Sequence, residues 1–181
     1  MNHHRAFPRL LLIMTLAIGL MACSGWDPQQ QATSDYEVAQ TVSRFKQRDP
    51  GLQRFFDKAY GYAVFPTIGK GGIGVGGAYG KGEVFEQGRA IGTAKMVQVT
   101  IGFQWGGQAY SELVFFEDKA ALDRFKSGNL ELSAQASAIA ITLGASATAD
   151  YEQGVAVFTM TKGGLMYEAS IGGQSFSFEP Y

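Results

Sequence analysis

The sequence predicts an α+β fold that is predominantly antiparallel β. We expect a β-sandwich or a barrel-like sheet, packed with two N-terminal helices and one mid-chain helix. Three observations lead to this prediction. Glycine makes up 24 of the 181 residues and is clustered, which is typical of β-rich folds with tight turns. From Tyr62 onward, apolar and polar residues alternate with the period of two that strands show. Helical spacing of apolar residues is confined to stretches 34–60 and 118–128.

The glycine-rich segment Gly69–Gly82 is the centre of this prediction. Eight of its fourteen residues are glycine, which excludes a helix because each interior glycine costs about 1 kcal/mol relative to alanine. Larger residues alternate with Gly72, Gly74, Gly76 and Ala78, as in a strand with one nearly bare face. A helix, a second sheet or a ligand could approach that face closely. We expect a helix to cover it.

Turn residues divide the rest of the β region. Tyr62–Phe65 is expected to be a short strand that Pro66 stops, and Gly80-Lys81-Gly82 is expected to turn the glycine strand into Glu83–Glu86. Gln87-Gly88 predicts a second turn. Further alternating segments predict strands at Met96–Trp105, Gln108–Phe116, Leu130–Thr142, Val155–Met160, Leu165–Ile171 and Gln174–Glu179.

Capping residues mark three helices. Ser34 with Glu37 three residues later fits a capping box and predicts a helix that runs to about Arg48. Asp49-Pro50 starts a second helix that Gly61 ends, and Asp118 starts a third that ends at Gly128. The first two helices are basic and amphipathic. They could lie on a membrane surface, although packing of their apolar stripes on the sheet is the favoured interpretation.

The N-terminus has the pattern of a bacterial lipoprotein signal peptide over residues 1–22. Arg5 and Arg9 precede an apolar run of signal-peptide length that is too short to span a bilayer. The run ends in Leu20-Met21-Ala22-Cys23, which resembles a lipobox whose cysteine becomes lipidated. An ordinary secretory signal is the alternative. We expect residues 23–33 to be a lipidated cysteine and flexible tether, residues 34–181 to be one domain, and the protein to sit on the outer membrane.

Composition excludes several chemistries. After removal of residues 1–22 the chain has 13 basic and 16 acidic side chains, a net charge of −3, so no nucleic-acid footprint is expected. His3 and His4 lie in the signal, and Cys23 is the only cysteine. A thiol nucleophile, a Ser-His-Asp triad and a zinc site of Cys and His are therefore excluded. We expect no enzyme activity, no metal and no cofactor.

Two motifs concern ligands. Gly69–Gly74 fits G-x-G-x-x-G, but a strand continues where a dinucleotide site needs a helix, so nucleotide binding is not expected. Lysines within glycine-rich turns can still meet anionic headgroups through backbone N–H groups, or can simply be solvated. The candidate headgroup residues are Arg44, Lys46, Arg48, Lys70, Gly71, Gly72, Lys81 and Lys162.

A polar strand face is the other candidate. Gln108, Tyr110 and Glu112 share one face of a strand, and Gln98 and Gln104 lie on the strand before it. This face could line a cavity or merely face water. An enzyme acting on a lipid or an envelope polymer through Glu112 is the least favoured of the functional hypotheses.

Several segments together resemble the SYLF domain family, in its bacterial lipoprotein form. The segments are Gly61-Tyr-Ala-Val-Phe-Pro66, Lys70-Gly-Gly-Ile-Gly-Val-Gly-Gly77, Gly102-Phe-Gln-Trp-Gly-Gly-Gln-Ala-Tyr110, Val114-Phe-Phe-Glu-Asp-Lys-Ala-Ala-Leu122, Phe125 with Gly128, and Lys162-Gly-Gly-Leu165. The resemblance implies a β-rich fold decorated by helices and an affinity for acidic lipid headgroups. In eukaryotic members it also implies actin bundling, which we do not expect of an exported bacterial lipoprotein.

Two functions remain open from the sequence. One is an envelope-anchored, non-catalytic module that binds anionic lipid headgroups. The alternative is a structural or protein-interaction lipoprotein without a small-molecule ligand, whose bare glycine face is buried by its own chain.

Overall fold

The structure is a computed structural model that describes residues 28–73, 75–101, 108–130, 132, 138–162 and 173–181. The chain divides into two units, Met1–Ser34 and Asp35–Tyr181. Of the first unit, the structure describes residues 28–34, which begin helix α1 (Pro28–Arg48). The second unit contains the rest of α1 and all the other described helices and strands.

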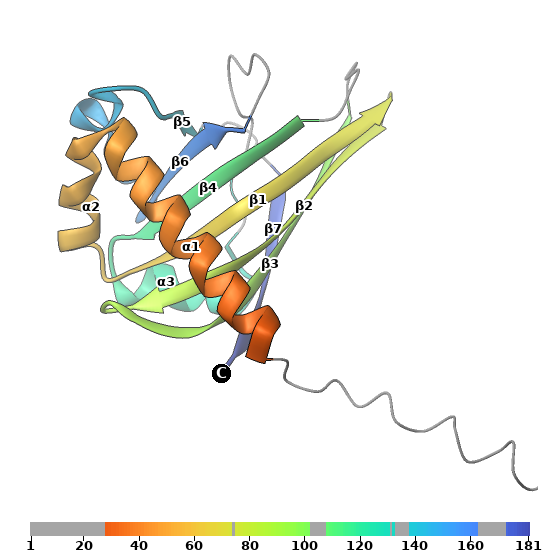
Figure 1. The fold of residues 1–181 in the computed structure, drawn as a ribbon, viewed down its shortest axis with the longest axis horizontal. Coiled ribbons are helices and arrows are strands. Elements are labelled where there is room, and N and C mark those ends of the chain that lie inside the picture. Colours follow the sequence, from red (N-terminus) through yellow and green to blue (C-terminus); the bar gives the residue numbers. More distant parts are fainter. Residues whose placement is uncertain (1–27, 74, 102–107, 131, 133–137, 163–172) are drawn as a thin grey trace, which may run out of the picture. The chain divides into compact units, whose positions relative to one another are not determined.

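The described part of the second unit is built on one seven-stranded sheet, with strand order β5-β6-β4-β1-β2-β3-β7 (Figure 1). Neighbouring strands are antiparallel except for the pair β5 and β6. The strands are β1 (Gly61–Ile73), β2 (Val75–Glu86), β3 (Arg89–Ile101), β4 (Gln108–Phe116), β5 (Ile139–Ala140), β6 (Val155–Thr161) and β7 (Gln174–Pro180). The predicted α+β class is confirmed, and the sheet is not closed into a barrel.

Helices pack on both faces of this sheet (Figure 1). The outer face carries Val64, Leu113 and Phe158, against which α1, the 3-10 helix η1 (Pro50–Leu52) and α2 (Gln53–Lys58) pack. The inner face packs against α3 (Lys119–Lys126). A second 3-10 helix, η2 (Ala145–Thr148), lies beside η1. The favoured interpretation of the first two helices, that their apolar stripes pack on the sheet, is confirmed.

The sheet curls strongly around its inner face. Phe65 on β1 and Phe176 on β7 have ring centroids 5.9 Å apart, although β2 and β3 lie between their strands. From Gly76 to Gly82, strand β2 presents Gly76, Ala78, Gly80 and Gly82 to this face, ahead of Val84. The missing side chains let groups from distant strands meet above β2.

The expectation that a helix covers the bare face of Gly72, Gly74, Gly76 and Ala78 stays a prediction. At Gly80 and Gly82, farther along β2 on the same face, a neighbouring strand fills the space of the absent side chains. A Cβ at Gly80 would lie 2.6 Å from Cγ1 of Ile68, and one at Gly82 would lie 2.7 Å from Cδ1 of Phe65. Both neighbours belong to the adjacent strand β1. The absent side chains are therefore replaced by the large ones of β1, because the strands of a tightly curled sheet crowd together on its concave side.

Strands β1 and β2 are also longer than predicted. Pro66 does not stop β1; the pairing shifts there by a β-bulge, which tolerates a residue without an N–H, and Ser111 Oγ donates to the Pro66 carbonyl at 2.7 Å. Gly80-Lys81-Gly82 is not a turn but the middle of β2, in register with β1. Lys70 likewise lies within β1, whereas Lys162 lies directly after β6.

Local signals predicted the structure correctly where a turn or cap decides it. Gln87 and Gly88 both have positive φ and connect β2 to β3. Asp118 caps α3 by accepting from the Ala121 N–H at 2.8 Å, and Gly128 follows the helix with φ 73°. Asp49 caps η1 by accepting from the Gly51 N–H at 3.0 Å.

Other element boundaries differ from the predicted ones. Helix α1 begins at Pro28, so Ser34 lies inside it and is not its cap, and α2 ends at Lys58, ahead of Gly61. Of the long strand predicted at Leu130–Thr142, the described residues form only β5. The signal peptide, Cys23 and Leu165–Ile171 lie outside the described residues. None of the helices in the described ranges is long and apolar enough to cross a membrane.

Candidate functional site

Part of the outer face of β1, β2 and β3 is apolar and open to solvent. Tyr79 and Val97 pair across β2 and β3 and are each 49% exposed, and Val99 is 67% exposed. Gly69 and Gly71 of β1 lie beside them with nothing within 4 Å of the Cβ position. We call this surface the outer apolar patch; its residues are Gly69, Gly71, Gly77, Tyr79, Val97 and Val99.

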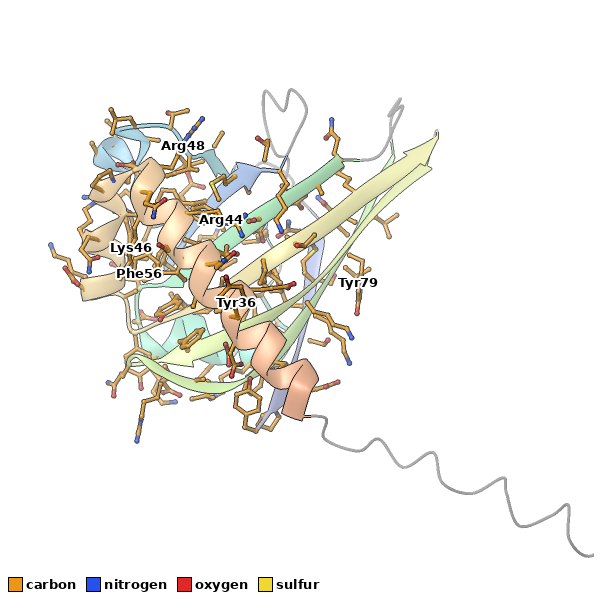
Figure 2. The ribbon with its side chains drawn as sticks, viewed as in Figure 1. Tyr36, Arg44, Lys46, Arg48, Phe56 and Tyr79 are labelled. Atoms are coloured by element: carbon orange, nitrogen blue, oxygen red, sulfur yellow. The ribbon has the colours of Figure 1, made fainter. Side chains whose placement is uncertain are left out.

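The patch is exposed because α1 crosses the other half of the sheet (Figure 1). Val38 and Phe45 of α1 are buried in the cluster that contains Val64 and Leu113, near the opposite ends of the strands. In Figure 2, Tyr79 lies beyond the area that α1 covers. Exposed apolar side chains that gather on one face indicate a surface that contacts a partner or a membrane.

Cations border the patch along the next row of the sheet. Thr67 pairs with Lys81, one step from the pair Gly69 and Tyr79. Lys162, which directly follows β6, donates from Nζ to Oγ1 of Thr67. Lys81 is exposed and faces the same side as Tyr79, two residues earlier on β2. The bulge at Pro66 thus places Thr67 where it holds a lysine from a distant part of the chain.

Arg44 on α1 lies close enough to Lys162 for their charges to interact. Burial lowers the pKa of Lys162, and the nearby Arg44 guanidinium lowers it further, while Glu37 on α1 acts in the opposite direction. A lysine whose pKa is lowered by a neighbouring cation is also a favourable place for an anion. We call Arg44, Lys81 and Lys162 the basic border of the patch.

Nearby carboxylates partly neutralise the positive charge of the basic border. Lys95, which pairs with Lys81 across β2 and β3, makes an exposed ion pair with Glu179 at 2.5 Å. Lys81 also contributes to lowering the pKa of the Glu179 carboxyl, after Lys95. The carboxylates of Glu37 and Glu179 therefore offset part of the positive charge of Lys162, Lys81 and Lys95.

Of the other predicted headgroup residues, the three cations lie away from the outer apolar patch. Lys46 is half-buried with its ammonium 4.2 Å from the centroid of the Phe56 ring, and Arg48 is exposed at the C-terminal end of α1 (Figure 2). Lys70 shares the inner face with Ile68, where burial lowers its pKa. Gly71 belongs to the patch, Gly72 lies next to it in β1, and Cys23 is outside the described residues.

Three residues of the polar strand face predicted from the sequence are buried and do not face water. Tyr110, Glu112 and Gln98 are all buried on the inner face, and Gln174 of β7 joins them there. Gln108 is exposed, and Gln104 is outside the described residues. No sequence signal pointed to Gln174, because β4 and β7 meet only through the curl of the sheet.

Among the residues that the structure describes, no three His, Cys, Asp or Glu side chains gather closely enough to hold a metal ion. The exposure of Val97 and Val99 was not predicted from the sequence. Alternation places them on one face together, but which half of that face α1 covers is set by tertiary packing.

Comparison with known proteins identifies the family of a large part of this chain. A family model described as "Ysc84: Las17-binding protein actin regulator" matches residues 97–180, which include part of β3 and all of β4, α3, β6 and β7. The chain carries a domain of this family. The SYLF resemblance drawn from the motifs is thereby confirmed.

A curated relative extends the match beyond those residues. Beta cell expansion factor A of Aeromonas veronii is 30% identical over 145 residues, which make up 74% of this chain. The aligned region is 51% of that protein, so this Ysc84-family chain spans about half the length of the curated relative it matches. The family is linked to lipid binding and actin regulation, and these links set the classes of partner to consider.

Proposed function

We propose that this protein is a non-catalytic module of the bacterial envelope that binds a membrane containing anionic lipids through the outer apolar patch and its basic border. The observation that carries the proposal is the position of Lys162. Thr67 holds its ammonium in the row of the sheet next to Gly69 and Tyr79, and Arg44 repels it. Anionic headgroups would relieve that repulsion while the patch contacts the acyl boundary.

The geometry supports a surface rather than a deep binding site. The patch lies on strands, so its backbone is held by neighbouring strands and does not have to become ordered on binding. Apolar area and cations occupy adjacent rows of one sheet face, which is the arrangement that interfacial binding requires. Each Lys or Arg near an anionic surface contributes on the order of 1 kcal/mol.

We further propose that Cys23 carries a lipid anchor and holds the domain at the outer membrane, facing the periplasm. The supporting observation is the lipobox-like Leu20–Cys23 after an apolar run. An anchored domain needs only weak headgroup affinity, because tethering raises the effective concentration of the second contact. Replacing Cys23 by Ala should release the protein from the membrane fraction. A Cys23→Ala protein that stayed there would contradict the lipid anchor.

Flotation with liposomes tests the surface itself. Residues 24–181 are mixed with neutral phosphatidylcholine vesicles or with vesicles that also contain phosphatidylglycerol. We expect binding to the anionic vesicles alone, weakened by salt because exposed charges are screened. The double variant Lys81→Gln/Lys162→Gln and the variant Val99→Thr should each weaken it. The matched control is Lys58→Gln/Arg89→Gln, which removes two exposed cations at the other end of β1 and β3.

A structural or protein-interaction lipoprotein is the alternative. It is favoured by Gly80 and Gly82, whose bare face is filled by the protein's own strand β1. No binding to either kind of vesicle would reject lipid recognition and leave this alternative. The Las17 binding and actin regulation in the family description are not part of the proposal for an exported chain.

A further inference from the structure

One carboxyl group is enclosed in the inner core. Glu112 of β4 has no exposed surface and lies between Tyr110 and Val114 along its strand. Phe65 of β1 and Thr159 of β6 flank it in register. None of the contacts described for the outer apolar patch involves this group, because the patch is on the other face of the sheet.

Glu112 links two strands that are far apart in the sheet. Gln174 of β7 donates from Nε2 to Oε2 of Glu112 at 3.1 Å, across β1, β2 and β3. The contact of Phe65 with Phe176 joins β1, the neighbour of β4, to the same strand β7. Within the described part of the sheet, β7 pairs with β3 alone, so the inner-face contacts are what tie it to β4.

The two other side-chain oxygens of Glu112 and Gln174 indicate that the Glu112 carboxyl group carries a proton. Oε1 of Glu112 and Oε1 of Gln174 are both buried, and neither has a hydrogen-bond donor among the described residues. A carboxylate and an amide carbonyl can only accept, so they cannot satisfy each other. A neutral carboxyl group can donate to an amide oxygen, which would give the pair two reciprocal hydrogen bonds.

We propose that Glu112 is a proton-binding site that clamps β7 to β4: the protonated carboxyl and the Gln174 amide form a two-bond pair, and loss of the proton breaks one bond and loosens β7. In the ionised state Oε1 of Glu112 and Oε1 of Gln174 are two acceptors that have no hydrogen-bond partner among the described residues. A buried unsatisfied acceptor is costly, and a buried charge more so. Release of β7 would loosen an edge strand of the sheet.

The surroundings favour titration in the neutral range. Burial raises the pKa of Glu112 to about 7, and the bond from Gln174 acts to lower it. The ionisable neighbour on its own strand is Tyr110, whose pKa burial and then Glu112 raise, while the Gln174 side chain acts to lower it. Across the inner face, β1 contributes Lys70 two rows away, whose pKa burial lowers.

The other strands present neutral groups to this region. β2 contributes Ala78, β3 contributes Met96 and Gln98, β6 contributes Thr159, and β7 contributes Gln174; α3 contributes Ala121, Leu122 and Phe125. Among the described residues, no cation is paired with Glu112, so burial in a mostly apolar site decides its protonation.

Side-chain NMR of the full-length chain in detergent micelles tests the proposal directly. The wild-type Glu112 carboxyl carbon and the Gln174 side-chain amide should titrate together, with a midpoint between about pH 6 and 8, around the raised pKa of about 7. Hydrogen exchange of the β7 amides, compared at each pH with Glu112→Gln, should show the opening constant rising roughly fivefold above the midpoint, as expected for one lost hydrogen bond. The Glu112→Gln variant keeps a neutral amide pair at every pH and should show no such step.

Two further variants separate the clamp from other acid groups. Gln174→Met should move the Glu112 midpoint upward and abolish the pH step in β7. Glu83→Gln, which removes another buried carboxyl whose pKa burial raises, should leave the step in place. A Glu112 midpoint below about pH 5.5 in the wild-type protein, which is closer to an ordinary glutamate than to a buried one, would overturn the proposal. So would β7 exchange that matches Glu112→Gln at all pH values.

Discussion

Phe65 and Phe176 contact each other with ring centroids 5.9 Å apart although their strands, β1 and β7, are separated by β2 and β3. The contact requires that β2 have almost no side chains beneath it, which Gly80 and Gly82 provide. The glycines of this chain therefore have two roles. Those on the inner face permit the curl, and Gly69 and Gly71 on the outer face leave an open surface.

The first prediction compares glycines on the two faces. Gly82→Ala should lower the free energy of unfolding by about 1–3 kcal/mol, because its Cβ would lie 2.4 Å from the Val64 carbonyl oxygen and 2.7 Å from Phe65. Gly71→Ala meets nothing within 4 Å and should change stability by less than about 0.5 kcal/mol. Urea unfolding of both variants measures the difference. Equal effects would show that the inner face is not crowded.

The second prediction concerns Asp49, which joins the helices to η2. Its carboxylate accepts from the Gly51 N–H at 3.0 Å and the Ser146 N–H at 2.7 Å. Burial acts to raise its pKa, but these hydrogen bonds outweigh burial and lower it below 3.8. Asp49→Ala should cost about 1–3 kcal/mol at neutral pH.

The sign of the pH effect follows from the lowered pKa. The contribution of the Asp49 charge is present above the unfolded pKa of 3.8 and is lost as the pH falls through the folded pKa. The stability difference between wild type and Asp49→Ala should therefore shrink below about pH 3.8. Asp150→Ala is the control, since this exposed carboxylate accepts from the adjacent Tyr151 N–H and does not join two elements. A difference that stayed constant far into the acid range would contradict this role.

The third prediction concerns Glu83 and Tyr181. Burial raises the pKa of Glu83, and the Tyr181 hydroxyl, which donates to Oε1 at 2.8 Å, acts to lower it. A raised folded pKa means that stability falls as the pH rises above the unfolded pKa of 4.5 and levels off above the folded pKa. Tyr181→Phe removes a bond to the ionised form, so its cost should be larger at about pH 8 than at about pH 5. Thermal unfolding at both pH values measures this, and an equal cost would count against it.

The fourth prediction tests the basic border. Because Arg44 lowers the pKa of Lys162, Arg44→Gln should raise that pKa, as measured by NMR of the lysine Nζ or Cε nuclei. Glu37→Gln should lower it, because Glu37 acts in the opposite direction. If Arg44→Gln leaves the Lys162 titration unchanged, the two cations do not share a surface, and the proposed headgroup site loses its main support.

Local chemistry made parts of this structure predictable. The Asp118 and Asp49 caps, the Gln87-Gly88 turn and the alternation in β4 depend on residues a few positions apart, so the sequence reports them directly. The predictions for Pro66 and for Gly80-Lys81-Gly82 failed for the opposite reason. Proline and glycine favour turns locally, but the pairing of β1 with two neighbouring strands kept both segments extended.

The candidate site shows the same division. The sequence identified lysines near glycines. Pairing across the sheet and the bulge at Pro66 place Lys81 and Lys162 both beside Thr67, whereas Lys70 lies on the inner face. It also placed Glu112 on a polar strand face without its partner Gln174, which is 62 residues away.

By itself, the sequence determined the family, the α+β class, the helix caps and the alternating faces of the strands, since each depends on composition or short-range spacing. Only the tertiary structure decided which side chains contact one another on those faces and which stay exposed. The curl of the sheet, possible because β2 lacks side chains at Gly80 and Gly82, buries Glu112 against Gln174. The path of α1 leaves Tyr79, Val97 and Val99 exposed.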